Sequence, residues 1–179
     1  MNRISVIFKN PYEIELLRDS LPPPRKGEVL VQTHLSAISP GTEMLVYRGQ
    51  FPPNLPADKN ITALAHDFRY PLKYGYTSIG RVVATGPAVS DCWLDQMVFC
   101  FNPHESHYVT HQDQLIPVPG DIDPADAVFL PNMESAVNFL MDGQPIIGEA
   151  VVIFGQGVVG LLAAAQLATL PLSCLVSLD

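Results

Sequence analysis

Basic residues are scarce in this chain: its 179 residues include 10 Lys and Arg against 18 Asp and Glu, which gives a net charge of −8. A chain of that sign is repelled by phosphate backbones and anionic headgroups, so nucleic acid and membrane surfaces are not expected partners. The first apolar run, Ile4–Phe8, is too short for a signal peptide. The three cysteines are scattered without a CxxC pair, and we expect reduced thiols in a cytoplasmic protein.

The sequence also lacks internal repeats and low-complexity tracts. Apolar residues make up 47% of the chain, which is enough to form a packed core. Many short apolar runs separated by turn residues predict a β-barrel in the N-terminal part. The strands are expected at Ile4–Phe8, Glu13–Arg18, Val29–Ile38, Arg81–Thr85, Gln96–Phe101, His107–His111 and Gln114–Val118. Between them we expect a short helix that ends near Gly49 and a long loop at Phe51–Tyr70; two helices should follow, one opening at Asp123-Pro124 and one over Pro131–Met141.

The stretch Ala150–Asp179 has the order strand, glycine-rich turn, helix, strand and acid, which opens a dinucleotide-binding βαβ unit. Its turn reads Gly155-Gln156-Gly157-Val158-Val159-Gly160, and the helix is expected over Leu161–Leu170. Gly155 would allow the tight turn, Gly157 the close approach of a diphosphate, and Gly160 the close packing of helix on strand. Backbone N–H groups at the helix start would hold the phosphate charge.

Asp179, at the end of the second strand, would accept hydrogen bonds from the adenosine ribose hydroxyls, which favours NAD over NADP. The alternative for this stretch is a membrane helix, because no charge occurs from Ala150 to Leu178. Three glycines, two glutamines and Pro171 interrupt that run, and no basic cluster flanks it, so the nucleotide interpretation is preferred.

A barrel, two short helices and then Gly-Glu-x-Val-Val-Ile-x-Gly-x-Gly-x-x-Gly resemble the medium-chain dehydrogenase/reductase superfamily, the group of zinc alcohol dehydrogenases and quinone reductases. The resemblance spans the chain and is carried by Gly27–Val31, Ser36–Ile38, Gly41–Glu43, Gly75–Gly80, Gln96–Phe99 and the dinucleotide motif. Residues 73–76 also resemble the subgroup around bacteriochlorophyllide dehydrogenases. The resemblance implies an α+β to α/β chain, with a GroES-like catalytic β-barrel domain at residues 1–143 and the first βαβ part of a Rossmann domain at 144–179.

The resemblance also implies hydride transfer between NAD or NADP and an alcohol, a carbonyl compound or an activated alkene. The positions of the family's zinc ligands, however, hold Ser39 or Pro40, Tyr76 and, near the third position, Asn132. None of these is a thiolate, imidazole or carboxylate, and the four-cysteine structural lobe is absent from the sequence. We therefore expect a zinc-free member with no metal site.

Without zinc, a side-chain hydroxyl must move the proton. Thr42 stands where the family has its Ser/Thr relay residue, and Tyr76 would point into the same cleft, with Lys73 near it in sequence. Either hydroxyl is a candidate catalytic group; equally weighted is the alternative that Tyr76 only fills the space that metal and ligands leave. Glu134 could bind substrate, although a charge that favours a helix N-terminus is the preferred interpretation.

His104, His107, His111 and Cys100 offer a metal site as a rival hypothesis, and with it a metalloenzyme. Alternation along the strand puts His107 and His111 on one face and leaves His104 in a loop, so a partly solvated barrel edge is preferred. Another rival is a non-catalytic dinucleotide-binding or structural protein of the same fold.

Two strands do not complete a nucleotide-binding sheet, so we expect a truncated gene or a fragment of a protein roughly twice as long. The fragment alone should show little turnover. A small-molecule substrate is expected, and a homodimeric parent is left open.

Overall fold

The computed structural model describes residues 1–51 and 69–179. The chain divides into two compact units, Met1–Val128 and Phe129–Asp179. The sequence placed the boundary between residues 143 and 144, after helix α3 (Leu130–Gly143). In the structure α3 packs against helix α4 (Val158–Leu167) and therefore belongs with the C-terminal unit, so the units divide before this helix rather than after it.

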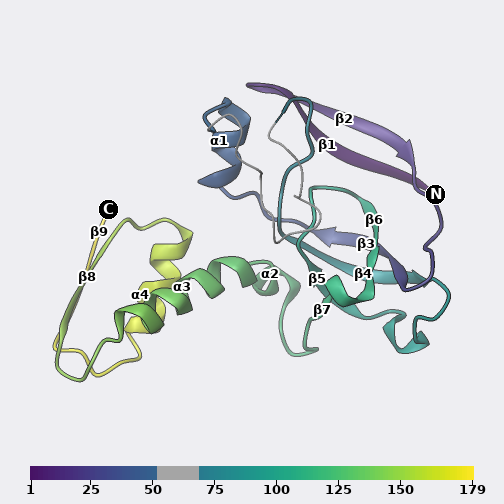
Figure 1. Ribbon diagram of the computed structural model, residues 1–179. Helices are drawn as coiled ribbons and strands as arrows, with labels where there is room; N and C mark the ends of the chain where they lie inside the picture. The colour runs from purple at the N-terminus through teal and green to yellow at the C-terminus, as the bar shows by residue number, and fades with distance from the viewer. Residues whose placement is uncertain (52–68) are drawn as a thin grey trace. The chain divides into compact units, whose positions relative to one another are not determined.

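The N-terminal unit contains a five-stranded antiparallel sheet in the order β6-β3-β4-β5-β7 (Figure 1). The strands are β3 (Glu28–Leu35), β4 (Ser78–Thr85), β5 (Met97–Cys100), β6 (His107–His111) and β7 (Ile116–Pro117). Apolar side chains from the central strands meet in one core, whose fully buried members include Val29, Val31, Val82 and Val98. Burial of these β-branched residues is the main force that holds the strands in register.

Strands β1 (Asn2–Asn10) and β2 (Glu13–Ser20) form a hairpin that is a separate two-stranded sheet. The hairpin joins the rest of the unit through two isolated bridges, Ser5 with Glu105 and Phe8 with Leu72. Among the described residues, the predicted barrel therefore consists of a five-stranded and a two-stranded sheet linked by bridges.

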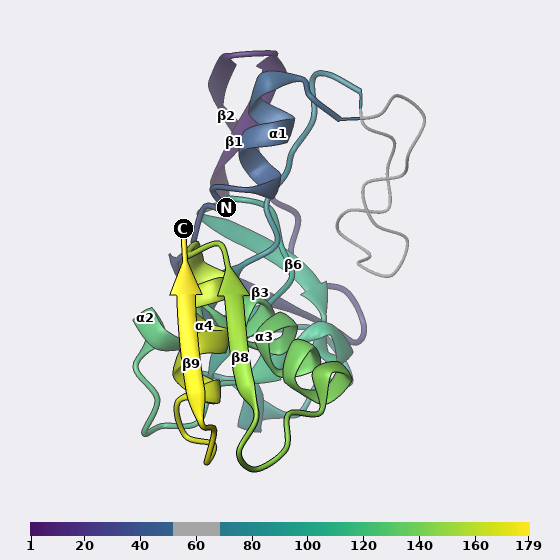
Figure 2. The same ribbon diagram turned by 90° about the vertical axis from the view of Figure 1, so that its left-hand side faces the viewer.

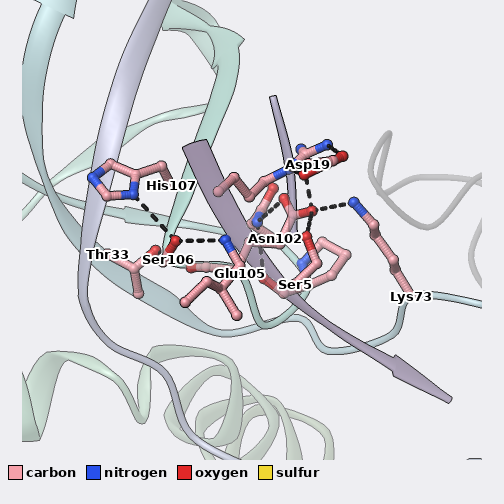
Figure 3. Close-up of polar contacts among 11 residues, drawn as sticks. Ser5, Asp19, Thr33, Lys73, Asn102, Glu105, Ser106 and His107 are labelled. Atoms are coloured by element: carbon pink, nitrogen blue, oxygen red, sulfur yellow. Dashed lines mark hydrogen bonds and ion pairs between the residues drawn. The ribbon is translucent and has the colours of Figure 1, made fainter. Parts of the chain in front are cut away.

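The carboxylate of Glu105 fastens this hairpin and is nearly buried (Figure 3). Its Oε1 atom accepts from Ser5 Oγ at 3.0 Å and pairs with Lys73 Nζ at 2.5 Å and with Arg3 Nη1 at 3.2 Å. Its Oε2 atom accepts from Asn102 Nδ2 at 3.3 Å. A buried charge needs such partners, and here they come from segments far apart in the chain, so the cluster is explained as a structural anchor.

Short helices complete the N-terminal unit. Helix α1 (Thr42–Arg48) ends at Gly49, whose φ of 69° is the left-handed conformation that stops a helix. Helix α2 (Pro124–Ala127) begins after Asp123, whose side chain accepts a hydrogen bond from the N–H of Ala125. Two turns of 3-10 helix, η2 (Asp91–Trp93) and η3 (Gln112–Gln114), lie in the connections that follow β4 and β6.

In the C-terminal unit, strands β8 (Ala150–Phe154) and β9 (Cys174–Leu178) pair in parallel, with α4 as the connection between them. Figure 2 shows the two strands side by side, with α4 and α3 on one face of the pair. This is a βαβ unit, as the sequence predicted. None of the helices in residues 1–51 and 69–179 combines the length and the hydrophobicity that spanning a bilayer requires.

The predicted elements are present, with shifted bounds. The β-strands occur where alternation placed them, although β3 stops at Leu35, β4 starts already at Ser78, and β7 has only two residues. Helix α4 begins at Val158 and ends at Leu167, earlier than the predicted Leu161–Leu170, because Gly157 serves as its N-cap inside the glycine motif. Most of the predicted loop Phe51–Tyr70 lies outside the described residues.

Candidate functional site

The glycine-rich turn of the C-terminal unit has the geometry that its sequence predicts. Gly155 has a φ of +93°, a conformation that side chains rarely adopt, and its N–H donates to the carbonyl oxygen of Leu178 at 2.7 Å. A Cβ atom at Gly160 would lie 2.0 Å from the carbonyl oxygen of Gly155. Glycine at both positions is therefore required by the fold itself: one makes the turn, and the other lets α4 approach it.

Gly157 is different, because among the described residues no atom beyond its own chain neighbours lies within 4 Å of the place where its Cβ would be. Packing against the described residues therefore does not demand glycine there. Gly157 is the N-cap of α4 and is followed by Val158 and Val159 in the first turn, where helix N–H groups lack partners inside the helix. An open backbone beside such N–H groups fits a phosphate group, which needs close approach and hydrogen-bond donors.

Asp179 lies beside the same turn: its Oδ1 atom accepts from the N–H of Gln156 at 3.3 Å. The side chain is exposed, so its second oxygen is available to a ligand. A cavity of about 570 Å³ adjoins the turn and is lined in part by Gly155, Val159 and Gly160. The seven residues predicted to bind the cofactor are thus brought together at the carboxyl ends of β8 and β9.

A second polar cluster lies within the N-terminal unit and joins three segments. His104 Nε2 is 2.7 Å from Glu43 Oε2, and His104 Nδ1 is 2.9 Å from Ser36 Oγ. Glu43 is 2% exposed and His104 is 8% exposed. The other carboxylate oxygen of Glu43 accepts from the N–H of Ser39 at 2.9 Å. All three members of the Ser36–His104–Glu43 cluster line one cavity of about 310 Å³.

Gly75 leaves the room that the His104 ring occupies. Its φ is +126°, and a Cβ atom there would lie 2.8 Å from His104 Nε2. The preferred sequence interpretation, which put His104 at a partly solvated barrel edge, is wrong for this residue because the loop after β5 turns it inward under Gly75. Sequence analysis missed Ser36 and Glu43 as partners of His104.

The two predicted catalytic hydroxyls lie in different surroundings. Thr42 opens α1 and is exposed, and its N–H donates to Ser39 Oγ at 3.4 Å. Tyr76 is partly buried and packs against a cluster that includes Phe8 and Leu72. Lys73, expected near Tyr76, extends instead to Glu105.

His107 and His111 lie on β6, an edge strand of the sheet, as expected for a partly solvated edge. Desolvation by burial lowers the pKa of His107, so its ring favours the neutral form. Cys100 is buried in the core, and burial raises the pKa of its thiol to about 11. Within residues 1–51 and 69–179, no three His, Cys, Asp or Glu side chains are grouped so that they could hold a metal ion.

No protein-family model matches the chain. The chain is 36% identical over 87 residues to the 2-desacetyl-2-hydroxyethyl bacteriochlorophyllide A dehydrogenase of Cereibacter sphaeroides, an alignment that covers 49% of this chain and 24% of that protein. This similarity agrees with the bacteriochlorophyllide dehydrogenase subgroup that residues 73–76 suggested.

Solved structures match almost the whole chain. An alcohol dehydrogenase from Escherichia coli CFT073, complexed with NADH, is 19% identical with a TM-score of 0.79, covering 99% of this chain and 57% of that one. A Sinorhizobium meliloti 1021 protein described as a zinc-binding dehydrogenase and bound to NADP is 17% identical with a TM-score of 0.77, covering 99% and 56%. A quinone oxidoreductase from Coxiella burnetii is 19% identical with a TM-score of 0.76, covering 98% and 56%.

The chain therefore has the fold of the alcohol dehydrogenase-like, medium-chain dehydrogenase/reductase proteins. It spans a little over half the length of these structures.

Proposed function

We propose that this chain belongs to a zinc-independent, NAD(P)-dependent oxidoreductase that transfers hydride between the nicotinamide cofactor and an alcohol, a carbonyl compound or an activated alkene. In this proposal the N-terminal unit is the GroES-like catalytic domain, and the βαβ unit is the first part of a Rossmann domain. The structural neighbours that contain NADH or NADP support the choice of cofactor. We also propose that the protein is soluble, is located in the cytoplasm and acts on a small molecule.

The observation that carries the proposal is the position of Gly157: it is the N-cap of α4, its Cβ side is open, and N–H groups without partners inside the helix follow it. The turn Gly155–Gly160 would hold the diphosphate through backbone N–H groups at the start of α4. Asp179 would accept hydrogen bonds from the adenosine ribose, and a 2′-phosphate beside its carboxylate would be repelled, so NAD is the proposed preference. The bound cofactor supplies or accepts the hydride, and the protein must position it and handle a proton.

The proposal of zinc independence rests on residue chemistry. Ser39 or Pro40, Tyr76 and, near the third position, Asn132 stand where the family has its zinc ligands, and none of them supplies a thiolate, imidazole or carboxylate. Thr42 and Tyr76 are the hydroxyls that sequence analysis nominates for the proton step, and the exposed Thr42 is the more accessible of the two. Metal analysis of the purified protein should find no stoichiometric zinc. One tightly bound zinc ion per chain would contradict the proposed zinc independence.

Titration with NADH, followed by its fluorescence, tests the cofactor assignment. Wild-type protein should give saturable binding, and Gly157→Ala should weaken it by about tenfold or more while lowering thermal stability only slightly, because the added Cβ meets the ligand and the only cost to the fold is a poorer helix N-cap. Gly120→Ala, in the N-terminal unit, is the matched control, since its Cβ also meets no atom of the described residues within 4 Å and Gly120 does not line the cavity beside the turn. Equal affinity in all three proteins would reject the proposal.

The second candidate function is a non-catalytic dinucleotide-binding or structural protein of the same fold. Saturable NADH binding without cofactor consumption by any carbonyl substrate would favour the non-catalytic binding protein. A purely structural chain would show neither binding nor consumption.

A further inference from the structure

The core of the N-terminal unit contains two hydroxyl groups, Ser78 Oγ and Tyr108 Oη, that have no hydrogen-bond partner among the described residues. Each of these residues is only 1% exposed. They come from different strands, since Ser78 begins β4 and Tyr108 lies within β6. A buried hydroxyl without a partner costs free energy, and native cores pair such groups either with protein atoms or with ordered water.

The two hydroxyl groups and the thiol of Cys100 lie close to one another. Tyr108 and Cys100 are members of the same buried core cluster. Burial and the nearby Cys100 thiol raise the pKa of Tyr108, whereas the hydroxyl of Ser78 lowers it. Such influences act at short range, so the three side chains converge, although the two hydroxyls do not meet in hydrogen-bond geometry.

The β4–β5 ladder places two short side chains at this point. Ser78 is directly opposite Cys100 in the register of these strands. Residues directly opposite each other point to the same face of a sheet, with their Cβ atoms about 5 Å apart, so Ser78 faces the same core as the buried Cys100. Because neither side chain is long, the phenolic oxygen of Tyr108 is bordered here by small polar groups rather than by large apolar ones.

A direct bond between the two hydroxyls would satisfy only one of them as a donor. If Tyr108 donates to Ser78, the hydroxyl hydrogen of Ser78 still needs an acceptor, and the same holds with the roles exchanged. The sulfur of Cys100 is a weak acceptor and a poor partner for that hydrogen. A water molecule can accept from both hydroxyls at once and still has two hydrogens to donate, so it satisfies the group more completely than a direct bond does.

We propose that the core of the N-terminal unit binds one ordered water molecule, held by Ser78 Oγ and Tyr108 Oη and in contact with the Cys100 thiol. Three polar partners are the usual number for an internal water. The water would connect β4 with β6, which are separated by β3 in the order of the sheet. The site lies wholly within the N-terminal unit and uses no residue of the proposed cofactor site, so it does not depend on the oxidoreductase function.

Magnetic relaxation dispersion of water ¹⁷O, which counts long-lived internal water molecules, tests the site in the 179-residue chain. Ser78→Ala and Tyr108→Phe should each hold one such molecule fewer than the wild-type protein. The double variant should lose the same single molecule, because both hydroxyls bind one water. Tyr12→Phe, which removes an exposed phenolic hydroxyl, is the matched control and should keep the wild-type count. Equal counts in all of these proteins, or a loss of two molecules in the double variant, would overturn the proposal.

A second measurement needs no variant and therefore does not depend on whether the substituted proteins fold. A crystal structure of the wild-type chain, at a resolution that shows ordered solvent, should contain a water oxygen within hydrogen-bond distance of both Ser78 Oγ and Tyr108 Oη. The same water should contact Cys100 Sγ. A direct hydrogen bond between the two hydroxyls, with no solvent between them, would contradict the proposal.

Discussion

The imidazole of His104 lies 2.7 Å from the carboxylate of Glu43, although the two residues are 61 positions apart in the chain. One follows β5 in a loop, and the other lies in the first turn of α1. Their pairing places a polar unit in a mainly apolar region next to a cavity, where it costs free energy unless both partners are present. The pair lies beside a cavity of about 310 Å³, at the lower end of the range of ligand pockets.

Removal of the Glu43 carboxylate should destabilise the fold. Glu43→Ala leaves both His104 Nε2 and the Ser39 N–H without their acceptor, and we expect a loss of about 3 kcal/mol in the free energy of unfolding. Urea denaturation measures this loss. Glu13→Ala, which removes an exposed carboxylate from β2, should leave the midpoint nearly unchanged. Equal urea midpoints for the two variants would show that the buried pair does not stabilise the fold.

Gly75 should be intolerant of substitution because of its backbone and because of His104. Gly75→Ala adds a Cβ at a φ of +126° and 2.8 Å from the ring, so a loss of about 2 kcal/mol and a displaced imidazole are expected. Thermal denaturation and the ring resonances of His104 measure the two effects. Gly120→Ala, whose Cβ would meet no atom within 4 Å, is the control. Unchanged His104 resonances in Gly75→Ala would contradict the packing described.

Local pattern was sufficient to predict several elements. The alternation of apolar and polar residues predicted the β1–β2 hairpin. Gly49 predicted the end of α1, and Asp123-Pro124 predicted the start of α2. The order of strand, glycine turn and helix around Gly155 was predicted, although α4 begins at Val158 inside the motif rather than at Leu161. In each case the residues that decide the conformation are neighbours in the sequence.

The polar cluster could not be predicted in this way. His104 is 68 residues from Ser36, and their contact depends on how loops at the ends of strands converge after the sheet has formed. A histidine in a proline-containing loop gives no sign of whether it points inward. Lys73 was misjudged for the same reason: it is near Tyr76 in sequence, but the partner it contacts, Glu105, comes from a distant segment. Long-range pairing of polar groups is set by topology rather than by local spacing.

The three cysteines should differ in reactivity. Cys92 and Cys174 are exposed, whereas Cys100 is buried with its thiol pKa raised to about 11. Because the thiolate is the reactive form, iodoacetamide at pH 8 should modify Cys92 and Cys174 and spare Cys100 in the folded protein. Peptide mass spectrometry reads the result, and rapid labelling of Cys100 without unfolding would contradict its burial.

The burial of Cys100 makes the stability of the folded protein depend on pH. The folded-state pKa of Cys100 is raised from 9.0 to about 11, so folding favours the neutral thiol. This contribution to stability is fully present below pH 9 and is lost as the pH rises towards 11. Between pH 8 and pH 10.5, wild-type protein should lose about 2 kcal/mol more unfolding free energy than Cys100→Ser. Parallel curves for the two proteins would contradict this.

The most direct measurement of the proposed function is a map of backbone amide shifts in ¹⁵N-labelled protein during titration with NADH. If the turn seats the diphosphate, the largest saturable shifts should occur at Gly157, Val158, Val159 and Gly160, with weaker ones beside Asp179. Gly157→Ala should make these shifts smaller at the same subsaturating NADH concentration. Saturable shifts confined to other parts of the chain, or no shifts at these four amides, would contradict a dinucleotide site at this turn.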